Sequence, residues 1–137
     1  MSRPVVVLTG PWRPHELLLH LVGILSTVGY IAGGPAPGSI TTTLPGWAVT
    51  AFYVLFGTGS TFGLVGCLMR QRALGPGLNQ GGLLIQAAAL VLYAVAILAY
   101  AGHRVWGVIL ILAGWTSANI WRAVQIQNAL RARAAPR

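Results

Sequence analysis

The chain has 137 residues, of which 55% are hydrophobic and 7% are charged, and its formal net charge is +8. Soluble domains are about a quarter charged, so this composition excludes an ordinary soluble domain, whose surface it could not cover with polar groups. All nine basic residues are arginines placed between long apolar runs, which favours the ends of membrane segments over a nucleic-acid interface.

Four apolar segments follow one another along the chain, each close to the roughly 20 residues that a helix needs to cross a bilayer. The sequence predicts spans at about 17–32, 47–68, 82–101 and 105–121, an N-terminal segment at 1–16 and a basic helical tail at 122–137. The connection around 102–104 is so short that spans three and four must form an antiparallel hairpin. The predicted fold class is therefore an all-α integral membrane protein, an antiparallel bundle of four transmembrane helices.

The arginines set the predicted orientation. In a four-span chain, all of them fall on one side except Arg104. The positive-inside rule then places both termini in the cytoplasm, in a multi-pass protein of the inner (plasma) membrane of a bacterial or phage-infected cell. The same side is expected to contact anionic lipid headgroups. The residues assigned to this topological or headgroup role are Arg70, Arg72, Arg122, Arg131 and Arg133.

A cleaved signal peptide is the alternative interpretation of the first span, because a charged start precedes an apolar run of moderate length. The long segment that contains Trp12 and the prolines after the span favour an uncleaved anchor.

Span one carries a predicted polar stripe. Its members are spaced four, three, four and three residues apart, so they share one helix face, which should point toward protein or water rather than lipid. We favour hydrogen bonding between helices as its role over the lining of a polar path. The stripe consists of Glu16, His20, Gly23, Thr27 and Tyr30. Milder versions of this pattern place Gln86 on a face of span three and Asn119 near the inner end of span four.

Glu16 is the only acid in the sequence. An acid in a span is a functional-site hypothesis by default, but this one lies at the edge of span one. We therefore expect either an interfacial salt bridge, with His20 at position i+4 or the nearby Arg13 as the partner, or a favourable charge at the start of the helix.

The segment HELLLH at 15–20 resembles a metalloprotease motif, which needs two histidines four residues apart on one helix face. His15 and His20 are five residues apart, so they point in different directions. With the sole acid already placed, neither a metal site nor a hydrolytic triad can be assembled. The sequence predicts no enzyme, no metal and no cofactor.

Span two contains GTGSTFGLVG, which looks like a phosphate-binding loop but lacks the lysine and the flanking strand that such a loop requires. On a helix, these small residues form one face that lets another backbone approach closely. We expect the bundle to pack around spans one and two through this face. The predicted helix-packing residues are Gly59, Ser60, Gly63 and Gly66.

Three functions fit this pattern. The favoured hypothesis is a non-enzymatic polytopic membrane protein that acts through helix–helix packing, as a subunit or scaffold of a membrane assembly. The first alternative is a holin-like pore or lesion former that self-associates and is encoded by a phage, and the second is a small proton-coupled or small-solute transporter that uses the polar stripe. The expected partners are the lipid bilayer and either other membrane subunits or further copies of the chain in a homo-oligomer, and no nucleic acid.

Overall fold

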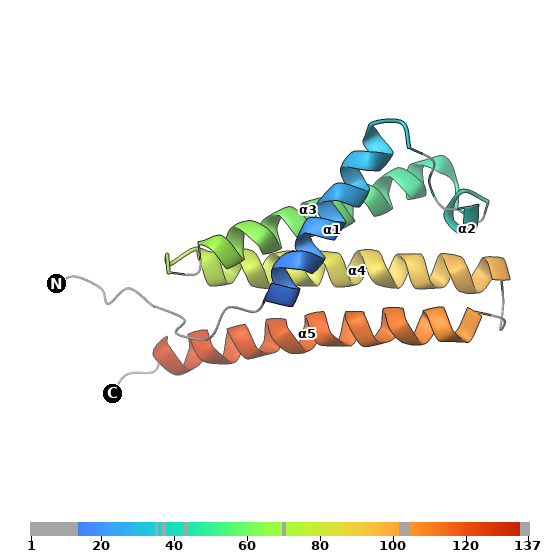
Figure 1. Ribbon diagram of the computed structural model, residues 1–137. Coiled ribbons are helices and arrows are strands. Elements are labelled where there is room, and N and C mark those ends of the chain that lie inside the picture. The colour runs from blue at the N-terminus through green and yellow to red at the C-terminus, as the bar shows by residue number, and fades with distance from the viewer. Residues whose placement is uncertain are drawn as a thin grey trace.

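The computed structural model describes residues 14–34, 36, 38–42, 44–69, 71–101 and 105–134. These residues form four long helices and one single-turn helix, and none of them is in a strand (Figure 1). Three helices, α3, α4 and α5, are long and apolar enough to cross a membrane. This confirms an all-helical fold with membrane-length apolar helices. The elements are α1 (Pro14–Ile31), α2 (Gly38–Thr41), α3 (Gly46–Leu68), α4 (Gly75–Ala101) and α5 (Trp106–Ala134).

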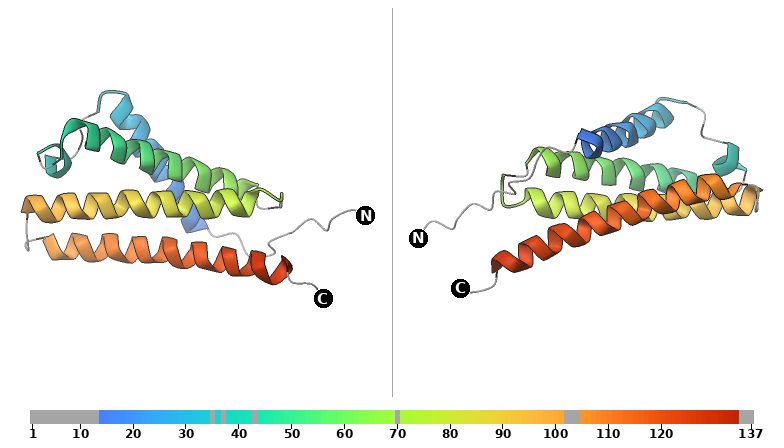
Figure 2. Two further views of the ribbon diagram at one scale, coloured as in Figure 1. Left: turned by 180° about the vertical axis from the view of Figure 1, so that it is seen from behind. Right: turned by 60° about the horizontal axis from the view of Figure 1, so that its bottom comes forward.

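The long helices lie in a row rather than around a common axis. Helix α1 packs on α3, α3 packs on α4 and α4 packs on α5, and within the described segments the backbone of α1 approaches neither α4 nor α5. Figure 2 shows α1 and α5 at opposite ends of this row, with α3 and α4 between them. The expectation of packing around the first two spans therefore needs correction, because the central pair is α3 and α4.

Helix α4 begins earlier than the sequence suggests. Span three was expected to start at Gly82, with the preceding glycines in a loop, but the helix starts at Gly75. Pro76 lies in the first turn, where a proline is favourable because its missing N–H has no helical partner to lose. Gly77 faces open space, and the close approach of α4 to α3 occurs further along the helix, at Asn79 and Gly82.

Helix α1 ends in a Schellman motif. The Gly33 N–H donates to the Tyr30 carbonyl at 3.1 Å and the Gly34 N–H donates to the Gly29 carbonyl at 2.9 Å. Gly33 has φ of 90°, a conformation that glycine adopts without steric cost. The single-turn helix α2 follows, and its Ile40 side chain is buried in the core.

Two apolar clusters stabilise the row. The larger one joins α3, α4 and α5 through ring contacts that include a tilted pair, Phe52 and Tyr93 at 5.4 Å, and an edge-on pair, Phe56 and Trp115 at 6.1 Å between ring centroids. The smaller one joins Leu83 of α4 to Ala123 and Ile126 of α5. Aromatic pairs of this kind contribute about 0.5–1.5 kcal/mol beyond the area they bury.

Helix α5 runs without a break from Trp106 to Ala134, so residues 122–134 continue the helix that contains the predicted fourth span. The predicted N-terminal segment up to residue 13, the short connection at 102–104 and the last three residues lie outside the described residues.

Candidate functional site: a polar cluster between the helices

A chain of buried side chains crosses three helices. The Asn119 Nδ2 atom on α5 donates to Gln86 Oε1 on α4 at 3.0 Å, and Gln86 Nε2 donates to Ser60 Oγ on α3, also at 3.0 Å. All three side chains are buried, and Ser60 and Gln86 are 0% exposed. Because a buried amide is costly when its hydrogen bonds are not made, this chain fixes the rotation and the register of α3, α4 and α5 relative to one another.

The predicted glycine face lies beside this chain, and most of it contacts α4. A Cβ atom added to Gly59 would lie 2.7 Å from the backbone nitrogen of Gln86, and one added to Gly66 would lie 2.6 Å from the Asn79 Cα. A Cβ on Gly82 of α4 would collide with the backbone of Gly63. These distances are shorter than van der Waals contact, so the two backbones approach as closely as glycine permits.

Helix α1 places its polar stripe against α3. A Cβ on Gly23 would collide with the Ser60 hydroxyl, and the His20 ring occupies the space where a Cβ on Gly63 would lie. The glycine face is thus shared: α4 covers one side of it and α1 covers the other.

The second half of the stripe also contacts α3. Thr27 lies over Gly57, and its Oγ1 donates to the Gly23 carbonyl at 3.0 Å and to the Tyr53 carbonyl at 3.3 Å. Tyr30 stacks on Tyr53, with ring centroids 4.1 Å apart. The structure therefore brings His20, Gly23, Thr27 and Tyr30 together at a single interface with α3.

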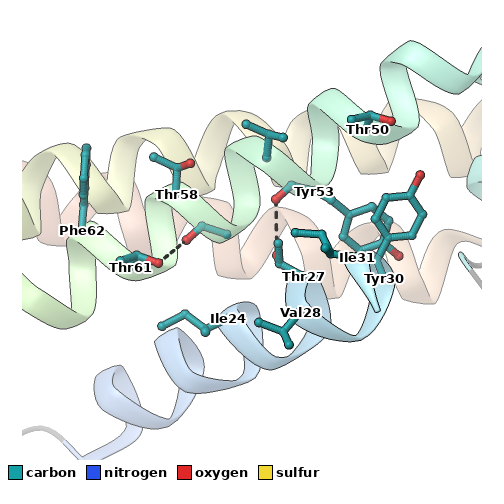
Figure 3. Close-up of a pocket in the computed structure, with 12 residues that line it drawn as sticks. Ile24, Thr27, Val28, Tyr30, Ile31, Thr50, Tyr53, Thr58, Thr61 and Phe62 are labelled. Carbon is teal, nitrogen blue, oxygen red and sulfur yellow. Dashed lines mark hydrogen bonds between the residues drawn. The ribbon is translucent and has the colours of Figure 1, made fainter. Parts of the chain in front are cut away.

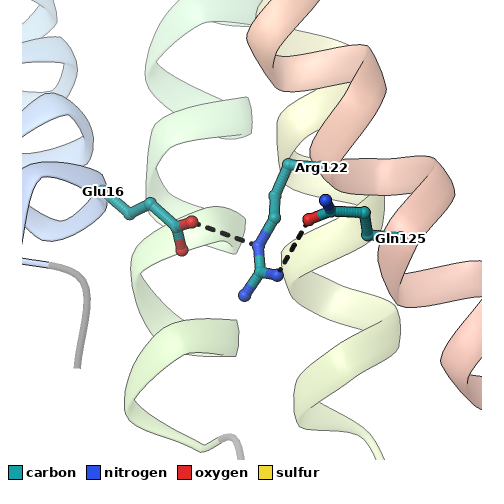
Figure 4. A network of polar contacts seen from close by, with 3 residues as sticks. All are labelled: Glu16, Arg122 and Gln125. Carbon is teal, nitrogen blue, oxygen red and sulfur yellow. Dashed lines mark hydrogen bonds and ion pairs between the residues drawn. The ribbon is translucent and has the colours of Figure 1, made fainter. Parts of the chain in front are cut away.

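Glu16 pairs with a residue that the sequence did not suggest. Its Oε1 atom lies 3.1 Å from Arg122 Nε on α5, and Arg122 also donates weakly to Gln125 Oε1 at 3.4 Å (Figure 4). The predicted pairing with His20 is wrong, because neither ring nitrogen of His20 has a hydrogen-bond partner among the described residues. The other expected partner, Arg13, lies outside them.

The arginines assigned to the headgroup role have different surroundings. Arg72 and Arg131 are exposed, at the end of the molecule where α3 meets α4 and where α5 ends (Figure 1). Arg122 takes part in the ion pair instead. Arg70 and the side chain of Arg133 lie outside the described residues.

A groove of about 420 Å³ is lined by residues of α1 and α3 (Figure 3). Its accessible lining is mostly apolar, and two of its hydroxyls, Thr50 and Thr61, already donate to carbonyls one turn earlier in α3. The groove therefore presents apolar surface with little hydrogen-bonding capacity left over.

The sequence did not identify several members of the cluster. Gln86 and Asn119 were placed on predicted faces, but nothing in their spacing indicated that they bond to each other and to Ser60. Gly82 and Asn79 were hidden because that stretch looked like a loop or a loop boundary. An amide inside an apolar run was the available signal, since such a group must find a partner.

In the part of the chain that the structure describes, no three histidine, cysteine or acidic side chains gather in a way that could hold a metal ion. The chain matches no protein-family model, no curated protein and no solved structure, so the assignment of function depends on the geometry alone.

Proposed function

We propose that the chain is an integral membrane protein with four spans and both ends in the cytoplasm, and that it acts without catalysis as a subunit of a membrane assembly. Within this proposal, α1 crosses the membrane in addition to α3, α4 and α5. Its outward face is apolar, with Leu18 61% and Leu25 68% exposed, while its polar face is turned toward α3. Such a face needs lipid as its surroundings.

The charged pair supports the same placement. With Trp106 at the outer boundary, Arg122 lies 16 residues further along α5 (122 − 106), or about 24 Å at 1.5 Å per residue. The hydrocarbon core is about 30 Å thick, so Arg122 and Glu16 lie just inside its cytoplasmic boundary. A charge at that depth is costly unless it is paired, and each of these two residues supplies the counter-charge that the other needs.

The outer face of α5 is the observation that carries the assignment as a subunit. In an apolar 18-residue segment of each helix, only 17% of the α5 segment is buried, against 44% of the α3 segment and 44% of the α4 segment. A Cβ added to Gly107 or Gly114 would meet nothing within 4 Å, unlike one added to the glycines between α3 and α4. We define the outer α5 face as the exposed positions at helical spacing that include these glycines: Gly107, Ile111, Gly114 and Ala118.

Small residues on a membrane helix allow close approach of a second helix. Inside this protein, Gly59 and Gly66 of α3 and Gly82 of α4 allow such a close approach between the two helices. The outer α5 face has the same kind of surface with no partner within the described chain, so we assign it to contact with a helix of another subunit.

The test is the size of the complex that is extracted directly into lipid discs without detergent. The monomer mass is 14.4 kDa, and we expect the wild-type protein to be recovered in a larger assembly. Gly114→Leu should reduce that assembly to the monomer, whereas Val108→Leu, on another side of the same helix, should leave it intact. Recovery of the wild type as a monomer would refute the proposal.

A further inference from the structure

His20 is a buried polar side chain with unused hydrogen-bonding capacity. It is 1% exposed, and both Nδ1 and Nε2 lack a partner within the described ranges. By contrast, the buried side chains of Ser60, Gln86 and Asn119 are linked to one another by hydrogen bonds. A neutral imidazole offers one donor and one acceptor, and here the structure satisfies neither.

The surroundings of the ring contain few groups that could respond to a change in its charge. Among the described helices, the backbone of α1 packs on α3, and the ring lies over Gly63 of that helix. The Cys67 thiol, one turn beyond Gly63, is the nearest ionisable group that α3 contributes along this face. The remaining charged groups are Glu16, one turn before His20 on α1, and its partner Arg122 on α5.

We infer that His20 is a proton-binding site, and that its protonated ring takes the Glu16 carboxylate from Arg122. A hydronium ion transfers its proton to a ring nitrogen, so that one O–H bond breaks, one N–H bond forms and a water molecule is released. A buried cation requires a counter-charge, and Glu16 is the only acid in the sequence. At a spacing of i and i+4, a carboxylate and an imidazolium on one helix can reach each other.

The exchange has a mechanical consequence because Glu16 and Arg122 form the only ion pair that links α1 to α5 among the described residues. In the structure, the carboxylate connects the first helix of the row to the last one. Once the carboxylate turns to His20, α1 is held by its interface with α3 alone, and Arg122 keeps its contact with Gln125. Proton binding at His20 therefore loosens α1 from α5.

A proton fits this site better than a metal ion does. His15, the nearest second histidine, is exposed whereas His20 is buried, so their side chains lie on different faces of α1. No group of three metal-ligating residues exists in the described part of the chain. A lone buried imidazole one helical turn from a carboxylate on the same helix provides a site for a proton and a counter-charge within reach of it.

The experiment measures the distance between α1 and α5 as a function of pH. Spin labels are attached to cysteines that replace Leu18 and Val124, which are both exposed, in a Cys67→Ser background. The full-length protein is placed in lipid discs of phosphatidylcholine and phosphatidylglycerol, and double electron–electron resonance is recorded at about pH 8 and about pH 5, the range in which histidine changes charge.

We expect a single distance at the higher pH and an additional, longer distance at the lower pH. His20→Gln should give the single distance at both values, and Glu16→Gln should give the longer distance at both. His15→Gln, which changes the exposed histidine of the same helix, should respond as the wild type does.

A wild-type distribution that does not change with pH would overturn the inference, and so would a pH response that survives in His20→Gln. Nitrogen-15 NMR of labelled wild-type protein provides a check that requires no substitution at His20. The absence of any imidazolium signal for His20 at the lower pH would overturn the inference as well. Diluting the doubly labelled protein with unlabelled protein suppresses distances between subunits, so these results do not depend on whether the outer α5 face binds another subunit.

Discussion

The contact between α3 and α4 depends on the absence of a side chain at Gly82, and Gly82→Ala tests this dependence. The added Cβ would lie 2.6 Å from the Gly59 carbonyl oxygen and 2.8 Å from the Gly63 Cα. Carbon atoms pack best at about 3.5–4.0 Å, so the two helices must separate by roughly 1 Å. The atoms that the methyl group meets belong to the backbone, which cannot turn aside as the end of a side chain can.

The expected cost follows from this geometry. Overpacking of a close contact destabilises a protein by about 1–3 kcal/mol, while replacing a helical glycine with alanine stabilises the helix itself by about 0.8–1 kcal/mol. Gly81→Ala is the control, because a Cβ at Gly81 meets nothing within 4 Å and the gain in helix propensity is the same. The difference between the two variants therefore measures the overpacking alone. We therefore expect Gly82→Ala to be about 1–3 kcal/mol less stable than Gly81→Ala.

The assay is reversible unfolding in mixed micelles, with the helical circular dichroism signal followed as the fraction of sodium dodecyl sulfate is raised. The two variants differ in one position of one helix, so differences in expression or in micelle composition affect them equally. Equal stability of Gly82→Ala and Gly81→Ala would show that α3 and α4 do not approach each other as closely as described.

Two further predictions concern the neighbouring contacts. Gln86→Leu removes both hydrogen bonds of the buried chain. Since hydrogen bonds between membrane helices contribute about 0.6 kcal/mol each, we expect the free energy of unfolding to fall by about 1 kcal/mol in the same assay. Gln127→Leu, at an exposed position, should cause no comparable loss. Gly57→Ala places a methyl group 2.6 Å from the Thr27 Cγ2 atom and should weaken the packing of α1 on α3. Faster proteolysis or chemical labelling of α1 would report this change. Gly29→Ala, whose added Cβ has no neighbour within 4 Å, should behave as the wild type does.

Periodicity was sufficient to predict which residues of α1 share a face. The spacing of His20, Gly23, Thr27 and Tyr30 is a property of the helix itself, and the structure places all four against α3. The positions and the apolar character of α3, α4 and α5 were predictable for a similar reason, since membrane-length runs of apolar residues are visible in any window of the sequence.

The partners of these faces could not be predicted in the same way. Arg122 is the partner of Glu16 because the fold brings the start of α1 near the middle of α5, and local spacing carries no information about that arrangement. The early start of α4 was missed because Gly75 and Pro76 are typical of loops as well as of helix beginnings. Their role depends on the neighbouring helix, which is a tertiary property.

The ion pair between Glu16 and Arg122 has a consequence for biosynthesis. In the proposed membrane topology, Glu16 is synthesised before Arg122, which follows it by 106 positions (122 − 16). Until Arg122 has left the ribosome, the Glu16 carboxylate has to remain near water or the lipid headgroups. Arrival of α5 would then fix the start of α1 in place, so a chain truncated before Arg122 should leave α1 more accessible to a water-soluble modifying reagent than the full-length chain does.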